Sequence, residues 1–267
     1  MDAALELRGI HKFFEMGTVN ENHVLKGIDL RIEKGDFITV IGGNGAGKST
    51  LLNSIAGSFP VDSGQIMLDG MDITSAPAYE RAKDISRVFQ DAKMGTATRL
   101  TIEENMAIAW NRGKKRTLAR GFTKKQQHLF KEELKQLGLG LEDRLKMEAG
   151  LLSGGQRQAL TLLMAALVTP KLLLLDEHTA ALDPKTSQMV LNLTDQLISE
   201  KQLTTLMITH NMEQAITYGN RLIMMSDGHI VVDVSGDEKR DLTVPDLLDL
   251  FKRNSGQVVS EDALLLG

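Results

Sequence analysis

The feature that most constrains the fold is a glycine-rich loop between a short apolar segment and a segment with helical character. Residues 36–41 are mostly apolar and β-branched, which is typical of a buried strand. Residues 48–55 have the composition of a helix. The loop matches the pattern G-x-x-x-x-G-K-[ST] and consists of Gly42, Gly43, Asn44, Gly45, Ala46, Gly47, Lys48 and Ser49. A strand, a glycine loop and a helix in this order predict an α/β core that binds phosphate groups.

The loop has the chemistry of a triphosphate site. Glycines allow positive φ angles and let backbone N–H groups approach an anion closely. The N-terminus of the following helix adds partial positive charge. We expect Lys48 to reach the β- and γ-phosphates and the Ser49 hydroxyl to bind Mg²⁺. Gly43 and Gly45 would also suit a dinucleotide fold, but Lys48 followed by Ser49 favours a triphosphate.

Two carboxylates end a second apolar segment. Residues 172–175 lack alternation, which is typical of a parallel strand buried on both faces, and Asp176 and Glu177 follow. Because ligands of an open α/β sheet bind beyond the C-terminal ends of its strands, we expect Asp176 to hold Mg²⁺ and Glu177 to polarise an attacking water. His210 follows another apolar segment, 205–209, where a lone histidine is more often structural than catalytic.

Residues 152–156 predict the start of a helix. Ser153 is a good N-cap, and Gln156 completes a capping box. The two glycines between them leave bare N–H groups in the first turn, which would form a second anion site; the plainer alternative is a well-capped core helix. Asp183 is a further predicted N-cap, because Pro184 occupies the first helical position after it.

Local signals also divide the rest of the chain. Capping boxes at Thr101 and Thr123 predict helices that end near residue 110 and at Gly138. Residues 227–228 predict a tight turn between two strands, and residues 245–251 predict a short helix before a polar tail.

Taken together, these patterns resemble the ATP-binding subunit of an ABC transporter. The phosphate loop, residues 152–156 (the signature segment, Leu-Ser-Gly-Gly-Gln) and then Asp176 and Glu177 occur in that family's order. The resemblance covers nearly the whole chain and implies a P-loop NTPase fold of the ABC ATPase type. This is a RecA-like core with an antiparallel β subdomain and an inserted α-helical subdomain. We expect a single domain: core and β subdomain over 1–90 and 170–252, helical subdomain over 91–169, and a tail over 253–267.

The resemblance implies a role for each matching residue. Glu177 matches the general base, His210 the switch histidine at the γ-phosphate, and Gln90 the glutamine that senses Mg²⁺ and couples to the membrane partner. The implied catalytic residues are Glu177, His210, Gln90 and Lys48. The implied metal ligands are Ser49, Gln90 and Asp176. The implied ATP contacts are Phe14, Gly42, Gly43, Asn44, Gly45, Ala46, Gly47, Lys48, Ser49 and Thr50, and, from the surface that completes the site of a second copy, Ser153, Gly154, Gly155, Gln156 and Asp183.

Two assignments leave alternatives. Relatives stack an aromatic ring on adenine just after the first strand, where Phe14 aligns better than Phe13. Most relatives carry proline after the catalytic glutamate, whereas this chain carries His178. That ring either tunes the pKa of Glu177 or is a neutral substitution.

Composition limits the possible functions. The chain has 267 residues, a net charge of −4 and no cysteine, which argues against nucleic acid as the main partner and against a disulfide framework. No apolar run is long enough to span a membrane, and the N-terminus lacks the basic start of a signal peptide. We therefore expect a cytoplasmic protein, and the resemblance implies that it is peripheral on the inner face of the membrane. The basic cluster within 112–125 is either a solvated face or a surface near anionic lipid.

Several phrases are similar to ATPases of branched-chain amino-acid importers, namely residues 62–66, 72–74, 79–82 and 100–105. The resemblance implies ATP and Mg²⁺ as cofactors, a separate transmembrane permease, a solute-binding protein that acts indirectly, and a dimer with a second copy or a similar ATPase. One alternative is a soluble ABC ATPase that serves as an assembly or repair factor. Another is a binding module without catalysis, against which Lys48, Asp176, Glu177 and His210 argue.

Overall fold

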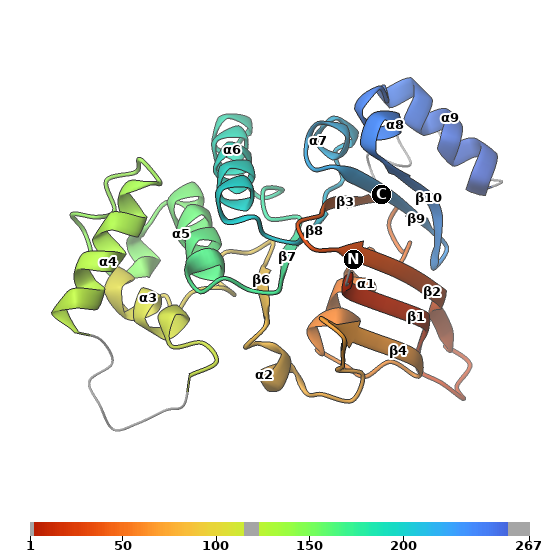
Figure 1. The fold of residues 1–267 in the computed structure, drawn as a ribbon, viewed down its shortest axis with the longest axis horizontal. Coiled ribbons are helices and arrows are strands. Elements are labelled where there is room, and N and C mark those ends of the chain that lie inside the picture. Colours follow the sequence, from red (N-terminus) through yellow and green to blue (C-terminus); the bar gives the residue numbers. More distant parts are fainter. Residues whose placement is uncertain (1–2, 115–122, 256–267) are drawn as a thin grey trace. The chain divides into compact units, whose positions relative to one another are not determined.

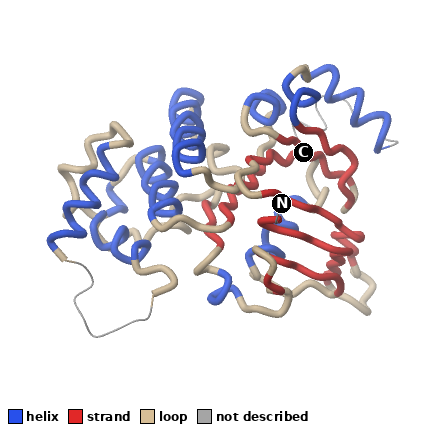
Figure 2. The backbone as a smooth tube through the Cα atoms, viewed as in Figure 1, coloured by secondary structure: helices blue, strands red, loops and turns tan. Residues whose placement is uncertain are grey.

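The computed structural model describes residues 3–114 and 123–255, which form two compact units. The first unit comprises the chain up to Arg81 and from Leu203 onward, and the second comprises Ala82–Gln202. The first is rich in strands and the second is mainly helical (Figures 1 and 2). The predicted α/β class is confirmed.

An antiparallel sheet forms one part of the first unit, with strand order β2-β1-β4-β5. Its strands are β1 Ala3–Phe14, β2 Asn22–Glu33, β4 Ser63–Leu68 and β5 Met71–Asp72. Leu7 of β1 pairs with Leu30 on one side and Ile66 on the other, and all three side chains are buried. Apolar side chains therefore line one face of the sheet, as expected for a half-buried antiparallel sheet.

A second group of strands in this unit delivers the phosphate loop. Its strands are β3 Phe37–Ile41, β8 Thr205–Ile208, β9 Arg221–Ser226 and β10 His229–Ser235. β3 lies between β8 and β9 and is parallel to both, while β10 is antiparallel to β9. Every residue of β3 is buried, which explains why its sequence lacks alternation. Asp227 and Gly228, with φ 45° and 76°, make the predicted tight turn between β9 and β10.

The helices of the first unit are α1 Lys48–Ala56, α2 Ala78–Arg81, α7 Met212–Thr217, α8 Gly236–Arg240 and α9 Val244–Ser255. The expected helix over 245–251 was too short, because α9 extends beyond it at both ends. Thr243 and Asp246 exchange backbone and side-chain hydrogen bonds that fix the start of α9. Leu247 and Phe251 then bury it in a core that includes residues of β9, β10 and α7.

The second unit contains two parallel strands and a group of helices. The strands are β6 Ile85–Val88 and β7 Leu172–Asp176, which pair with each other. The helices are α3 Ile102–Trp110, α4 Lys124–Lys135, the 3₁₀ turn Ala149–Leu151, α5 Gly154–Leu167 and α6 Pro184–Lys201. α5 contacts α3, α4 and α6 (Figure 1).

The predicted helix starts in this unit are confirmed. Thr101, Thr123 and Ser153 each form a complete capping box, and Asp183 caps α6. α4 ends at Lys135, before the predicted stop at Gly138, whose positive φ of 63° lies in the turn that follows. Within the basic cluster, residues 115–122 lie outside the described residues. No helix in the described parts of the chain has the length and apolar character needed to cross a membrane.

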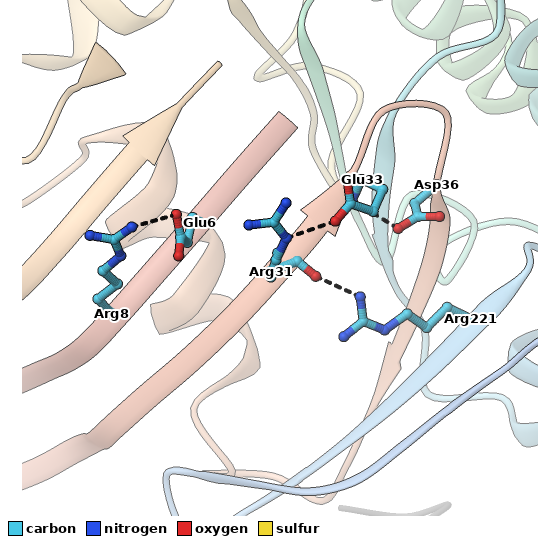
Figure 3. A network of polar contacts seen from close by, with 6 residues as sticks. All are labelled: Glu6, Arg8, Arg31, Glu33, Asp36 and Arg221. Carbon is cyan, nitrogen blue, oxygen red and sulfur yellow. Dashed lines mark hydrogen bonds and ion pairs between the residues drawn. The ribbon is translucent and has the colours of Figure 1, made fainter. Parts of the chain in front are cut away.

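A polar network joins the start and end of the first unit (Figure 3). Arg221 at the start of β9 donates to the carbonyl of Arg31 at 2.6 Å and pairs with Asp233 of β10. Arg31 in turn donates to the Glu33 carboxylate at 2.7 Å, and the Glu33 N–H donates to Asp36 at 2.9 Å. The network links β2, β9 and β10 just before the chain enters β3.

Arg81 is a buried cation whose hydrogen-bond partners among the described residues are all backbone carbonyls. Its guanidinium donates to the carbonyls of Ser54 and Ile55 at the end of α1, at 2.8 and 2.9 Å. It also donates to Thr74 and Ala76 in the loop that follows β5. Positive charge at a helix C-terminus is favourable, so Arg81 stabilises the helix that begins at the phosphate loop.

Arg81→Met should therefore lower the free energy of unfolding by about 2–4 kcal/mol, because buried carbonyls lose a charged donor. Urea denaturation followed by circular dichroism would measure this. Arg8→Met is the matched control, since Arg8 is exposed and forms a surface ion pair with Glu6. Its unfolding free energy should stay near that of the wild type. Equal stabilities of the two variants would contradict the role assigned to Arg81.

Candidate nucleotide-binding site

The phosphate loop packs directly against backbone atoms of β9 and β2. A Cβ atom at Gly42 would lie 2.2 Å from the carbonyl oxygen of Met225, so no other residue fits there without movement. A Cβ atom at Gly47 would lie 3.1 Å from the Val24 carbonyl, and Gly47 has a positive φ of 97°. The N–H of Gly228 donates to the Ala46 carbonyl at 3.2 Å. These contacts fix the path of the loop.

The start of α1 has the properties of an anion site. Gly47 occupies the N-cap position and no side chain caps the helix there. Backbone N–H groups at such a helix start bind phosphate readily. The Lys48 ammonium is buried and donates to the carbonyls of Gly42 and Gly43, at 2.6 and 3.0 Å. It therefore lies over the loop, while the side chain of Ser49 is exposed.

The two candidate adenine rings differ in their surroundings. Phe14 is 38% exposed and meets Phe59 edge to face, with ring centroids 5.3 Å apart. The Lys12 ammonium lies 5.5 Å from the centroid of the Phe14 ring. Phe13 instead stacks on His23 with centroids 3.9 Å apart. Phe14 has the more accessible ring, which is consistent with a stacking role.

His210 follows the buried strand β8 and is exposed. The residues on either side of it are fixed: the Thr209 hydroxyl donates to Gln214, and Asn211 caps α7 by accepting the Gln214 N–H at 2.8 Å. His210 thus lies at a strand end between two anchored residues. Its position at the C-terminal end of a parallel strand is where ligands of α/β sheets bind.

In the second unit, an ion pair holds the carboxylate that ends β7. Arg87 of β6 donates to Asp176 at 2.5 Å, and each side chain is 15% exposed. The two strands are parallel neighbours, which brings these side chains together. A partly buried carboxylate that is paired in this way has a fixed orientation.

Glu177 follows immediately and has an unusual backbone conformation. Its φ is 45°, in the left-handed region that costs a non-glycine residue about 1–2 kcal/mol. The N–H of Ala180 donates to the Glu177 carbonyl at 3.0 Å and closes a turn. Four other described non-glycine residues, Glu15, Asp69, Gln202 and Asp227, share this region, so the conformation is that of a tight turn directly after β7.

His178 is buried, with 2% of its surface exposed, and its Nε2 atom lies 2.9 Å from the Thr194 hydroxyl of α6. Burial lowers the pKa of His178 to about 4. The imidazole is therefore neutral at physiological pH. The sequence analysis gave two alternatives for this ring: it tunes the pKa of Glu177, or it is a neutral substitution. Both alternatives stay predictions.

The signature segment begins α5 and is anchored from within the same helix. Ser153 and Gly154 are exposed, and the Ser153 hydroxyl accepts the Gln156 N–H. Arg157 is buried and donates to the carbonyls of Ala149, Gly150 and Leu152, which precede the segment. The signature segment is thus an exposed, capped helix start, and its role as a second anion site stays a prediction.

The two signature glycines have different surroundings. A Cβ atom at Gly154 would meet only Leu182, at an ordinary 3.4 Å. A Cβ atom at Gly155 would lie 2.1 Å from Cγ2 of Thr186 in α6. Gly155 is thus required for the packing of α5 on α6, whereas the fold itself does not require Gly154. Asp183 is exposed at the start of α6, where its carboxylate accepts the Thr186 N–H at 3.1 Å. Hydrogen bonds from the Thr186 hydroxyl and from its backbone N–H lower the pKa of Asp183.

The predicted site residues are divided between the two units. The first unit contains Phe14, the phosphate loop 42–50 and His210, and the second contains Gln90, Asp176, Glu177, the signature segment and Asp183. Within the described residues, no group of three or more His, Cys, Asp or Glu side chains could hold a metal. Hydroxyl, amide and single carboxylate oxygens nevertheless suit Mg²⁺, which takes its other ligands from phosphate and water.

Sequence reasoning missed two positioning residues, Arg87 and Arg157. A charged residue within the apolar segment 85–89 was an available signal for Arg87, because a cation in a buried strand needs a partner. The partner itself depends on the pairing of β6 with β7, which no local pattern specifies. Arg157 bonds to carbonyls of a loop whose path the sequence does not reveal.

A buried strand that leads through a glycine loop into an uncapped helix start defines a P-loop nucleotide-binding protein. Residues 25–180 match the family model for the ABC transporter. The chain is 45% identical to a tyrosine transport ATP-binding protein of Clostridioides difficile, covering 93% of this chain and 98% of that protein. It is 34% identical to a phosphonates import ATP-binding protein of Lactobacillus gasseri, covering 97% of each. It is 33% identical to a bacitracin export ATP-binding protein of Halalkalibacterium halodurans, covering 92% and 94%.

A solved structure agrees with these relatives. It is the dimeric post-hydrolysis state of an ATP-binding cassette bound to ADP and phosphate, with a TM-score of 0.72 and 29% identity, covering 86% of this chain and 98% of that one. This chain belongs to the ABC transporter family as an ATP-binding subunit, and it is an ATPase of the ABC type. The predicted fold family is thereby confirmed.

The contrast between the two signature glycines is testable. Gly155→Ala should destabilise the protein by about 1–3 kcal/mol, because the new methyl group overpacks against Thr186. Gly154→Ala is the matched control and should unfold at the wild-type urea concentration or slightly above, since alanine favours a helix. The double variant Gly155→Ala/Thr186→Ala should regain stability relative to Gly155→Ala. Failure of the double variant to do so would exclude the clash as the cause.

The burial of His178 predicts a pH dependence of stability. Between its ordinary pKa of 6.5 and the folded value of about 4, the unfolded chain binds a proton that the folded chain does not. The free energy of unfolding therefore falls as pH drops below 6.5 and levels off near pH 4, by on the order of 3 kcal/mol from this group. Urea denaturation of the wild type and of His178→Gln at several pH values would isolate this contribution. Parallel pH profiles would contradict the prediction.

Proposed function

We propose that this subunit powers an importer of an amino acid or a related small solute through a separate membrane permease. The observation that carries this proposal is the 45% identity to a tyrosine transport ATP-binding protein along nearly the whole length of both chains. A second relative, the phosphonates import ATP-binding protein, also supports transport in the import direction. In this arrangement the chain is peripheral on the inner face of the membrane, and a solute-binding protein acts through the permease.

We assign ATP to the phosphate loop and the adjoining aromatic ring. Phe14 stacks on adenine, while residues 42–50 and the ammonium of Lys48 bind the phosphates. This assignment is supported by the uncapped start of α1 and by the accessible Phe14 ring. Ser49, Gln90 and Asp176 are the residues that would hold Mg²⁺, which when bound neutralises charge on the β- and γ-phosphates.

We assign the general base to Glu177. A carboxylate in a fixed backbone conformation after β7 can accept a proton from the water that attacks the γ-phosphate. His210 donates a hydrogen bond to the γ-phosphate in this proposal. The intact set of Lys48, Asp176, Glu177 and His210 disfavours a binding module without catalysis.

We further propose that the working form is a dimer of this chain with itself or a similar ATPase. The exposed signature segment and Asp183 suit the second side of a nucleotide site, because an exposed helix start with bare N–H groups attracts phosphate. The solved relative that is a dimer bound to ADP and phosphate supports this form.

The class of solute is less constrained than the chemistry. The branched-chain amino-acid type inferred from short phrases is not confirmed, since the tyrosine transport relative indicates amino-acid transport of another type. The relatives that are about one-third identical to this chain include both a phosphonates import protein and a bacitracin export protein. An amino acid or a similar small solute is therefore the narrowest class that the relatives support.

The proposal predicts the behaviour of Glu177→Gln. Hydrolysis should fall by about 10²- to 10⁴-fold, because the water loses its base, while ATP still drives dimer formation. Phosphate release and size-exclusion chromatography with ATP would measure the two properties. Glu200→Gln is the matched control, because it makes the same change on an exposed face of α6. Unchanged turnover of Glu177→Gln would remove Glu177 as the base.

The same variant, tagged and recovered with ATP from detergent-solubilised cells, should carry a polytopic permease identified by mass spectrometry. Recovery of soluble proteins alone would favour the second candidate function, an ABC ATPase that assists assembly or repair.

A further inference from the structure

His178 and Thr194 form a buried connection between the end of β7 and the middle of α6. The His178 Nε2 atom lies 2.9 Å from the Thr194 hydroxyl oxygen, and the two residues are 2% and 1% exposed. Both belong to the second unit. Such a connection between two side chains excludes water and has a fixed geometry.

The direction of the hydrogen bond follows from a third group. The Thr194 hydroxyl lies 2.8 Å from the carbonyl of Val190, one turn earlier in α6, and donates its single hydrogen there. Its oxygen is then the acceptor for His178. The hydrogen-bond geometry therefore assigns the proton of the neutral imidazole to Nε2. A side chain in this place needs a donor at the Nε2 position.

The connection holds one side of a short segment that contains Glu177. On the other side, Asp176 is held by Arg87 of β6 at 2.5 Å. Glu177 lies between these anchored residues in a left-handed backbone conformation, with φ 45°. Strained conformations of this kind persist only where neighbouring contacts hold them.

α6 anchors the loop that precedes it, residues 177–183, near both ends of that loop. His178 bonds to Thr194 near the middle of the helix, and Asp183 caps its first turn through the Thr186 N–H. Between them, the Ala180 N–H donates to the Glu177 carbonyl. The backbone of residues 177–183 is thus fixed on a single rigid element.

We propose that His178 is a positioning residue for ATP hydrolysis: by donating to Thr194, it holds the backbone of Glu177 in the conformation that aims its carboxylate. This inference rests on the proposed role of Glu177 as the general base. It explains why a buried polar ring that needs a buried partner stands next to Glu177. Loss of the bond should lower kcat, because a displaced base works poorly, and should leave ATP binding by the first unit intact.

Thr194→Val tests the proposal, because it removes the hydroxyl and keeps the shape of the side chain. We expect kcat to fall roughly 10- to 100-fold. KM for ATP and the affinity for ATP measured by fluorescence titration should stay within about twofold of the wild type. Thr161→Val is the matched control: the Thr161 hydroxyl is also buried, in α5, and donates to the Arg157 carbonyl instead of to the segment 176–178. Its kcat should be unchanged.

Conservative variants separate positioning from packing. Thr194→Ser keeps the hydroxyl and His178→Gln keeps a donor near the Nε2 position, so both should retain most of kcat. His178→Leu fills similar space without a donor and should lose it. If urea denaturation shows that Thr194→Val does not fold, the comparison of His178→Gln with His178→Leu is sufficient to test the proposal. In the Glu177→Gln background, Thr194→Val should cause no further loss, since the connection acts only through Glu177.

Three outcomes would overturn the inference. These are an unchanged kcat in folded Thr194→Val and His178→Leu, a loss of activity that matches a loss of ATP affinity, and a full further loss in the Glu177→Gln background. Turnover of the single variant Glu177→Gln distinguishes a failure of the positioning role from a failure of the proposed function. Wild-type turnover of Glu177→Gln would reject the assignment of the base, whereas an impaired Glu177→Gln with an active Thr194→Val would reject only the positioning role.

Discussion

At Gly42 the phosphate loop lies against the carbonyl of Met225, at a distance that leaves no room for a side chain. This approach joins the loop to the end of β9, and a backbone bond from Gly228 to Ala46 joins it again one turn later. The loop is therefore supported by backbone atoms of β9 and of the turn that follows it. Preorganised N–H groups bind an anion without first losing conformational entropy, so nucleotide binding depends on how closely this loop packs.

A common device supports the helices of both units. Cations bind the carbonyls at the C-terminal ends of three helices: the buried Arg81 at α1 and Lys239 at α7, and the half-buried Arg112 at α5. Burial lowers the pKa of Lys239 to about 8, yet three carbonyl oxygens accept from its ammonium. Positive charge at the C-terminus completes the helix dipole. The N-termini of α1 and α5 are then the helix ends that attract anions, and both lie in glycine-rich segments.

The sequence predicted the local features well because their signals are local. The capping boxes at Thr101, Thr123 and Ser153 each depend on residues three positions apart, and all three are present. The start of α9 was placed one residue too late because Thr243 and Asp246 cap it by exchanging hydrogen bonds, and the helix also continues past Phe251 to Ser255. The pairing of Arg87 with Asp176 and the bond between His178 and Thr194 could not be predicted, since each joins segments whose proximity depends on the fold. The roles assigned to Phe14, Gln90, Glu177 and His210 remain predictions that activity measurements must decide.

The sequence indicates the ATP chemistry more narrowly than the transported solute, and this difference has a physical basis. The chemistry of a triphosphate and its metal restricts which residue types can bind them, so the phosphate loop and the strand-end carboxylates are recognisable from their residue types alone. A transported solute, by contrast, is bound by a permease and makes no contact with the ATPase in the proposed arrangement. Relatives with one-third identity can therefore differ in solute and even in direction, as the phosphonate and bacitracin proteins do. In the proposed arrangement, the ATPase affects the permease through the timing of hydrolysis, and the proposed role of His178 makes that timing depend on how the segment around Glu177 is held.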